Sequence, residues 1–206
     1  MTSSLIHPAT SLVLASGSAS RASVLRQAGI PVEISVAAVD EAEIKASLRG
    51  EGFSVERVAE ALAEAKAQRV ATRFSGSFVI GADQMLDIDG EWLDKPRDLA
   101  EAERHLRLLR GRRHRLICSA VLVKDGTRLW HHTAQAALTM RAFSDDFLAQ
   151  YLAAAGPQLL GTVGAYQLEG LGAQLFERID GDFFTILGLP LLPLLAILRQ
   201  HRVIAS

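Results

Sequence analysis

Two short segments near the N-terminal end of the chain carry residue types that bind phosphate in other proteins. The segment Leu12–Arg21 runs from an apolar stretch into a loop of small residues and ends on an arginine. Backbone N–H groups at a strand-to-helix loop can bind an anion. Ser16 and Ser18 add hydroxyl donors, and the planar guanidinium group of Arg21 can donate two hydrogen bonds to a phosphate. The alternative is a plain loop with an N-cap serine, since neither a Walker motif nor GxGxxG is present. The other segment holds Lys66, which by itself is typical of a lysine on a helix surface.

Two further segments supply a carboxylate and another lysine. Asp83 follows the apolar run Phe78–Ile80. A carboxylate at the carboxyl end of a buried strand could bind a divalent cation or accept a proton from water. Lys95, beside Pro96, offers a compact positive charge. The alternatives are a turn-forming aspartate and a solvated loop lysine.

Strands and helices alternate around these segments. Apolar runs and alternating patterns predict strands at Leu12–Ala15, Val32–Val36, Phe78–Ile80, Leu116–Val123 and Leu129–Met140. Turn residues predict hairpins at Asp89–Gly90 and Lys124–Gly126. Helices are expected after the small-residue loop Ser16–Ser20, after Ser54, Asp98 and Ser144, and in the apolar C-terminal stretch Phe183–Leu198. This order predicts an α/β fold, a mixed twisted sheet flanked by helices, with residues 1–206 as a single domain and the middle hairpins forming a second lobe.

Composition narrows the classes of function. The chain has 206 residues and 22 Lys plus Arg against 23 Asp plus Glu, a net charge of -1 that argues against binding long nucleic acid by bulk electrostatics. The single cysteine, Cys118, excludes an intramolecular disulfide and a cysteine-cluster metal site. The first ten residues lack a signal-peptide pattern, and Phe183–Leu198 is shorter than the ~20 apolar residues of a membrane span. We therefore expect a cytoplasmic protein without a membrane partner.

One run of basic residues lies between positions 104 and 115. Arg104, Arg107 and Arg110 fall three residues apart, which places them on one stripe of a helix. We interpret the run as a solvated face balanced by neighbouring glutamates. The alternative is a nucleic-acid-binding patch, which the lack of interleaved aromatic residues disfavours.

Taken in order, these segments resemble the motifs of the Maf family of nucleoside triphosphate pyrophosphatases over roughly residues 11 to 198. The matching segments are Ala15–Arg21, Asp40–Glu41, Leu62–Ala67, Gly81–Asp83, Lys95–Pro96, Leu109–His114, Gly164–Tyr166, Gly170–Gly172 and Gly188–Pro190. Each motif is short, but the ordered set is specific. The resemblance implies a Maf-like and ITPase-like fold with two lobes around a nucleotide-binding cleft. It also implies attack of water at the α-phosphorus of a nucleoside triphosphate, which yields a nucleoside monophosphate and pyrophosphate.

The resemblance further implies roles for individual residues. Asp83 would accept a proton and, together with Glu41, bind Mg²⁺ or Mn²⁺. Lys95 would be the third catalytic residue and would hold phosphate oxygens. The residues expected to bind the substrate are Ser16, Ser18, Arg21 and Lys66 for the phosphates, and Gln84 and Glu169 for the base or sugar.

Departures from the family pattern bear on the substrate. Ser20 stands where the family has a second arginine, so either Arg21 acts alone or a residue of the 104–115 run supplies the second charge. Gln84 replaces the usual threonine, and Glu169 replaces a glutamine of the dTTP/UTP branch. Both are closer to the branch linked with 7-methyl-GTP, because a carboxylate fits the N1–H and N2–H donors of guanine.

The resemblance leaves two functions from different classes. The first is an enzyme that clears the nucleotide pool of canonical or modified triphosphates. The alternative is a nucleotide-binding regulator of septum formation with little or no hydrolysis, which would not need both Asp83 and Glu41 near the phosphates. By analogy with the family, a homodimer is also expected as an assembly.

Overall fold

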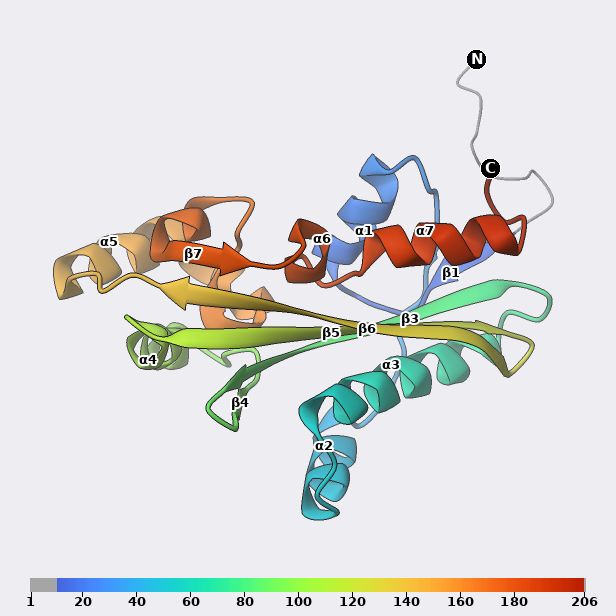
Figure 1. Cartoon of the computed structure of the whole chain (residues 1–206), viewed down its shortest axis with the longest axis horizontal. Coiled ribbons are helices and arrows are strands. Elements are labelled where there is room, and N and C mark those ends of the chain that lie inside the picture. The colour runs from blue at the N-terminus through green and yellow to red at the C-terminus, as the bar shows by residue number, and fades with distance from the viewer. Residues whose placement is uncertain (1–10, 206) are drawn as a thin grey trace. The chain divides into compact units, whose positions relative to one another are not determined.

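A computed structural model describes residues 11–205, which form a mixed α/β structure around one seven-stranded sheet (Figure 1). The strands are β1 (Leu12–Leu14), β2 (Glu33–Ile34), β3 (Phe78–Ile88), β4 (Glu91–Leu93), β5 (Arg113–Lys124), β6 (Thr127–Met140) and β7 (Phe176–Asp180). The helices are α1 (Ala19–Gln27), α2 (Glu41–Gly50), α3 (Val55–Ala71), α4 (Leu99–Leu109), α5 (Asp145–Ala155), α6 (Phe183–Ile186) and α7 (Leu191–Gln200). Three short 3-10 helices are η1 (Gly156–Gly161), η2 (Val163–Ala165) and η3 (Leu171–Leu175). The predicted mixed sheet flanked by helices is confirmed.

The sheet combines parallel and antiparallel pairs in the order β2-β1-β3-β5-β6-β7, with β4 paired to β3 outside this path. Strand β1 is parallel to both β2 and β3, whereas β3 with β4 and β6 with β7 are antiparallel. Leu14 lies opposite Ile80, and the next residue, Ala15, donates its N–H to the carbonyl of Ile80 at 2.8 Å. The loop after β1 therefore lies beside the Gly81–Asp83 segment of β3, because parallel strands run in the same direction.

The chain divides into two compact units, and each is composed of several segments. The described residues of unit 1 are 11–83, 118–134 and 188–205, and those of unit 2 are 84–117 and 135–187. The chain crosses between the units at four points. Three of them lie inside β3, β5 and β6, and the fourth lies in the connection between α6 and α7. The single domain over residues 1–206 stays a prediction.

In unit 1, helix α3 packs an alanine-rich stripe on one face of the sheet. Figure 1 shows α3 on this face, and α1 and α7 on the opposite face. The fully buried residues shared by α3 and the strands beneath it are Ala63, Ala67, Val70, Val13, Ala15, Val79, Val121 and Val123. Alanines keep the helix backbone close to the strands, which brings longer side chains of α3 within reach of polar groups on β3.

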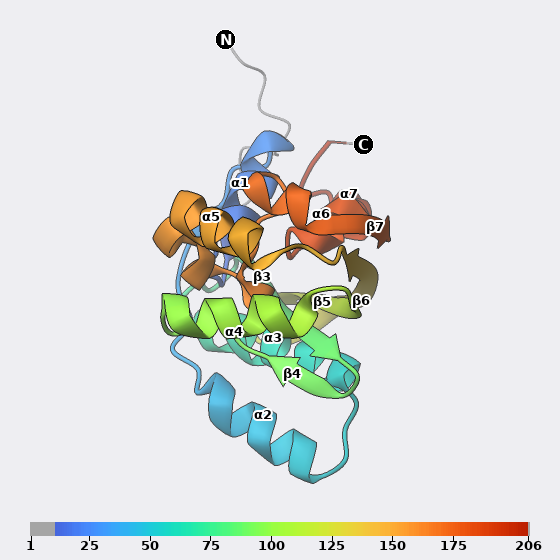
Figure 2. The ribbon, with the colours of Figure 1, turned by 90° about the vertical axis from the view of Figure 1, so that its left-hand side faces the viewer.

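In unit 2, helix α4 begins where capping residues predicted it. The carboxylate of Asp98 accepts the N–H of Glu101 at 2.7 Å, and Glu101 in turn accepts the N–H of Arg97 at 2.8 Å. Leu106 and Leu109 are fully buried in the apolar core of this unit. Helix α5 contacts α4 and runs beside it in Figure 2.

Several elements differ from the sequence-based expectation. Helix α2 was not expected; it begins after Asp40, whose carboxylate accepts the N–H of Glu43, but none of its residues is buried, so it has no clear apolar period. Strand β7 was also not expected, because four of its five residues are exposed. Strand β3 does not end at Asp83 but continues to Ile88, so Asp83 lies inside the strand.

The apolar C-terminal stretch is divided between two helices rather than forming one. Helix α6 ends at Ile186 and α7 begins at Leu191, because Gly188 adopts a φ of 93° and Pro190 lacks an N–H. Among the helices of residues 11–205, none combines the length and the apolar character needed to cross a membrane.

Candidate active site

The loop between β1 and α1 holds one hydroxyl group in a defined orientation. Ser18 caps α1, and its Oγ accepts the N–H of Arg21 at 3.4 Å. Ser16 Oγ accepts two hydrogen bonds, from the N–H of Ser18 at 3.2 Å and from Nη1 of Arg21 at 3.0 Å. A hydroxyl has two lone pairs and one hydrogen. With both lone pairs occupied, Ser16 is left as a donor, which is the polarity that an anion requires.

Arg21 is buried and partly committed to the protein itself. Its Nε donates to the carbonyl of Gly188 at 2.7 Å, which ties the loop to the segment before α7. Its Nη1 holds Ser16. Within residues 11–205, Nη2 makes no hydrogen bond, so this nitrogen remains available to a phosphate oxygen. Arg21 therefore orients the loop and can also contribute charge.

Lys66 joins two carboxylates on neighbouring elements of unit 1. Its Nζ lies 2.6 Å from Oδ1 of Asp83 and 2.8 Å from Oε1 of Glu41, the first residue of α2. Lys66 is only 8% exposed. The interpretation of Lys66 as a helix-surface lysine is therefore wrong, because its helix face is covered by β3 and by the start of α2. The structure brings together three residues that the sequence placed in separate motifs.

Gly81 makes this contact geometrically possible, and its role was missed at the sequence level. A Cβ at position 81 would lie 2.0 Å from the carbonyl oxygen of Ala63 and 2.8 Å from Cβ of Ala67. Only glycine lets β3 pass this close to α3. Since side chains alternate along a strand, Asp83 points to the same face as Gly81, toward α3. A glycine inside a buried strand is a known signal of close backbone approach and could have indicated this contact.

The second oxygen of Asp83 is the unusual atom of the cluster. Oδ2 is buried and has no hydrogen-bond partner among the described residues, whereas Oδ1 accepts from Lys66. Buried polar atoms are normally hydrogen-bonded, so this carboxylate oxygen is a position at which a water, a metal ion or a substrate can bind. Residues 11–205 contain no group of three or more His, Cys, Asp or Glu side chains arranged for a metal ion. Mg²⁺, however, needs only one or two carboxylates when substrate phosphates and waters complete its shell, and Glu41 with Asp83 fit that donor set.

Gln84 follows Asp83 but belongs to unit 2, and its amide has a fixed orientation. Its Nε2 donates to the carbonyls of Thr185 and Ile186, both at 3.0 Å. Because both partners are acceptors, the nitrogen and oxygen of this amide are unambiguous. The carbonyl oxygen Oε1 is the part of the side chain left to accept a hydrogen bond.

Lys95 and Glu169, both in unit 2, are exposed on loops. Lys95 follows β4 and lies at a hollow of about 420 Å³ between β4 and α4, lined also by Trp92, Arg97 and His105. Glu169 lies on the turn before η3, where a Cβ on Gly172 would come within 2.4 Å of the carbonyl oxygen of Gln167. The loop is thus compact around Gly172 and presents Glu169 at its surface.

The basic run at 104–115 is paired with carboxylates of unit 2. Arg107 and Arg110 both bind Asp145, at 2.7 and 2.6 Å. Arg112 binds Asp89 and Arg115 binds Asp87; Arg107 also pairs with Glu103 on its own helix. These contacts agree with a solvated face balanced by carboxylates and leave the stretch with little net charge for a polyanion.

A buried histidine and tyrosine from two of the motifs face each other in unit 2. Nε2 of His114 lies 2.8 Å from the hydroxyl of Tyr166, and Nδ1 of His114 is buried without a partner within the described part of the chain. Burial lowers the pKa of His114 to about 4 and raises the pKa of Tyr166. Both groups are therefore neutral near pH 7 and belong to the core of unit 2.

The fold and the polar cluster define an α/β protein with an anion-binding loop and a pair of carboxylates held by one lysine. The sequence profile described as "Maf-like protein" matches residues 11–201, so this chain belongs to the Maf family. It is 54% identical over 193 residues to a nucleoside triphosphate pyrophosphatase of Granulibacter bethesdensis, a match that covers 94% of this chain and 98% of the relative. It is 56% identical to the protein of the same name from Paramagnetospirillum magneticum, covering 92% and 97%. A 7-methyl-GTP pyrophosphatase of Rhizobium etli is 49% identical, covering 92% and 95%.

Proposed function

We propose that this protein is a nucleoside triphosphate pyrophosphatase, a hydrolase of acid anhydrides that converts a nucleoside triphosphate and water into a nucleoside monophosphate and pyrophosphate. The observation that carries this proposal is the unpartnered, buried Oδ2 of Asp83 beside a lysine that joins Asp83 to Glu41. Relatives at about half identity over nearly the whole chain are named for this activity. A pure nucleotide binder has no need of a buried carboxylate oxygen placed to accept a proton.

The triphosphate is bound by donors that the structure leaves available. The Ser16 hydroxyl and Nη2 of Arg21 supply two donors from the β1–α1 loop, and the N-terminus of α1 adds a favourable dipole for an anion. Lys66, in the same unit, adds positive charge. The role of Lys95 in holding phosphate oxygens stays a prediction from the family resemblance. The arginines at 107, 110, 112 and 115 are engaged by carboxylates of unit 2, so we assign the phosphate contact to Arg21 alone.

Asp83 is the proton acceptor of the reaction. The water oxygen forms a bond to the α-phosphorus while the bond from that phosphorus to the bridging oxygen of pyrophosphate breaks. Oδ2 of Asp83 takes the proton that the water releases, and pyrophosphate leaves with the electron pair of the broken bond. Lys66 holds Oδ1, which fixes the direction of Oδ2.

Glu41 and Asp83 would hold the divalent cation, Mg²⁺ or Mn²⁺, that the family resemblance implies. When bound, such an ion neutralises charge on the triphosphate and makes a coordinated water more acidic. Lys66 contacts both carboxylates and so keeps them close together.

We expect Gln84 and Glu169 to favour a guanine base. The free Oε1 of Gln84 and the carboxylate of Glu169 are acceptors, which match the N1–H and N2–H donors of guanine. A pyrimidine dione offers fewer donors. Relatives named 7-methyl-GTP pyrophosphatase match this chain at 49–51% identity, so we propose 7-methyl-GTP as a substrate.

Asp83→Asn tests the role of Asp83. Loss of a general base typically costs about 10²–10⁴-fold in rate, so we expect pyrophosphate release to fall by that factor while the melting temperature stays close to wild type. Asp87→Asn is the matched control, because Asp87 is a buried aspartate on the same strand, paired instead with Arg115. Turnover by Asp83→Asn equal to that of the control would refute the assignment.

A substrate panel tests the reaction and the base together. Pyrophosphate release is measured from 7-methyl-GTP, GTP, dTTP and UTP, with Mg²⁺, with Mn²⁺ and with a chelator. We expect release that depends on the metal and is fastest for 7-methyl-GTP. Tight binding of a nucleotide with no release under any condition would instead indicate the regulator of septum formation.

A further inference from the structure

A polar stripe on helix α3 binds the hairpin between β5 and β6. Glu60, Glu64 and Gln68 are spaced by four residues and therefore share one side of the helix. Lys66 lies two residues from both Glu64 and Gln68, which places it on roughly the opposite side, at 3.6 residues per turn. The stripe and the lysine thus occupy two flanks of the same helix.

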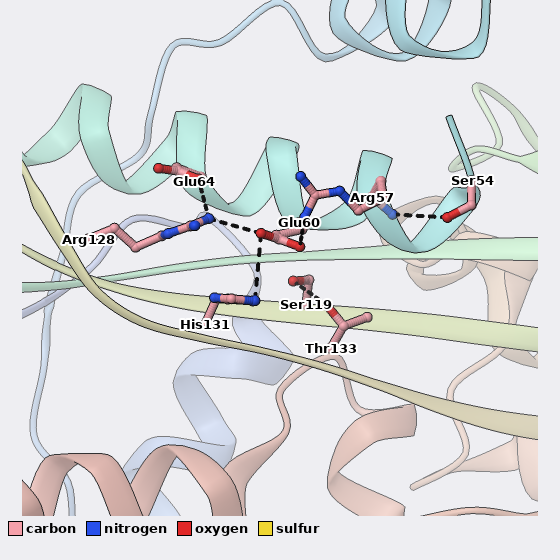
Figure 3. Close-up of polar contacts among 8 residues, drawn as sticks. All are labelled: Ser54, Arg57, Glu60, Glu64, Ser119, Arg128, His131 and Thr133. Carbon is pink, nitrogen blue, oxygen red and sulfur yellow. Dashed lines mark hydrogen bonds and ion pairs between the residues drawn. The ribbon is translucent and has the colours of Figure 1, made fainter. Parts of the chain in front are cut away.

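Glu60 is the centre of this stripe (Figure 3). Its side chain is only 8% exposed. Oε1 accepts from Nη1 of Arg128 at 2.9 Å, and Oε2 accepts from Nη1 of Arg57 at 2.6 Å. His131 of β6 approaches Oε1 at 3.8 Å. A buried carboxylate is costly unless it is paired, so Glu60 strongly favours the helix position in which Arg128 reaches it.

Two further contacts extend the attachment along the helix. The same Nη1 of Arg128 donates to Oε2 of Glu64 at 2.8 Å. One turn further, Nε2 of Gln68 donates to the carbonyl of Gly126 at 3.1 Å. The hairpin therefore holds α3 over more than two turns, which are the turns that carry Lys66.

We propose that Arg128, Glu60 and Glu64 form a clamp that positions Lys66 against Asp83 and Glu41. On one flank, the clamp prevents α3 from rotating or sliding. Beneath the helix, Gly81 determines the distance between the backbones of α3 and β3. Buried ion pairs add little net stability compared with apolar packing, but they can specify one geometry. The contribution of the clamp to turnover rests on the proposed function; the position of Lys66 does not.

Arg128→Met and Arg128→Lys test the clamp. Both contacts of Arg128 come from one nitrogen, and a lysine ammonium carries three donors, so lysine can replace both bonds whereas methionine replaces neither. The Arg128 side chain is 37% exposed, so the methionine variant is expected to fold. Val203→Ala, a cavity in the fully buried core of unit 1, is the control for a mere loss of stability.

The chain has only four lysines, Lys45, Lys66, Lys95 and Lys124, so NMR of ¹³Cε-labelled lysine gives a simple spectrum. Lys66→Arg assigns the Lys66 signal. We expect Arg128→Met to shift the Lys66 signal but not those of Lys45 and Lys95. We also expect a fall in kcat of about 10–100-fold, since misplacement by about 1 Å can cost ~100-fold. Arg128→Lys should restore both the signal and kcat.

An unchanged Lys66 signal in Arg128→Met overturns the clamp, whatever happens to kcat. A signal shift that Val203→Ala reproduces, or that Arg128→Lys fails to reverse, overturns it as well. If wild-type protein releases no pyrophosphate from any triphosphate, the proposed function fails, while the NMR comparison still decides whether Arg128 positions Lys66.

Discussion

Gly81→Ala should separate α3 from β3 and lower turnover. The new Cβ would lie 2.0 Å from the carbonyl oxygen of Ala63, whereas ordinary contact begins near 3.4 Å. The two backbones must therefore move apart by about 1.4 Å, the difference between these distances. Ala63 O is a backbone atom of the helix and cannot rotate away as a flexible side chain could.

The expected size of the effect follows from this displacement. Lys66 is three residues beyond Ala63 and moves with the helix, so its 2.6 Å hydrogen bond to Asp83 would lengthen toward about 4 Å. A misplacement of about 1 Å at a reacting group can cost ~100-fold in rate. Added volume in a packed core costs about 1–3 kcal/mol in the free energy of unfolding. We therefore expect kcat to fall about 100-fold in a protein that still folds.

The assay is pyrophosphate release at saturating substrate, with thermal unfolding measured on the same preparations. Gly50→Ala is the matched control, because no atom lies within 4 Å of a Cβ at this position of α2. The control should keep wild-type kcat. A folded Gly81→Ala variant with wild-type kcat would refute the reasoning, because the close approach of β3 to α3 would then not determine the position of Lys66.

Two predictions concern stability. Burial lowers the pKa of His114 to about 4, below its ordinary 6.5, so the unfolded chain binds this proton more readily than the folded one. The free energy of unfolding should stay constant above pH 6.5 and fall by about 3 kcal/mol as the pH drops to 4. Urea unfolding of wild type and of His114→Gln should show this loss in the wild type alone. Equal losses in both proteins would contradict the assignment to His114. Asp98→Ala removes the 2.7 Å cap of α4 and should cost about 1 kcal/mol, or about 3 °C in melting temperature, so an unchanged melting temperature would mean that the cap adds nothing.

Sequence patterns predicted helix starts and a hairpin correctly where the stabilising contacts join residues close together in the chain. Ser54, Asp98 and Ser144 each cap the helix predicted after them, since a cap depends on an N–H two or three residues away. Helix α1 begins at Ala19, capped by Ser18, inside the stretch predicted as a loop to Ser20. The Asp89–Gly90 hairpin forms as expected, with positive φ at both residues. Helix α2 and strand β7 were missed, because neither buries an apolar face that periodicity could reveal.

The candidate site was predicted as a set of residues but not as an arrangement. Asp83, Glu41 and Lys66 were named from separate motifs, and only the fold shows that one ammonium contacts both carboxylates. The burial of Lys66 was not predicted, because helical period alone does not say which neighbour covers a face. Glu60 and Arg128 were not named at all, since a glutamate on a helix and an arginine after a turn are ordinary surface residues in a sequence.

The sequence by itself determined the mixed α/β class and the family, and it named candidate residues for the chemistry, because caps, turns and ordered motifs are local properties of the chain. Only the tertiary structure decided which of those residues contact one another. Arg21 meets Gly188 across 167 positions, and Lys66 meets Asp83 across 17, with a glycine to let the backbones approach. Such contacts depend on how strands pair and how closely a helix packs on them, and a buried lysine or an unpartnered carboxylate oxygen is defined only after that packing is complete.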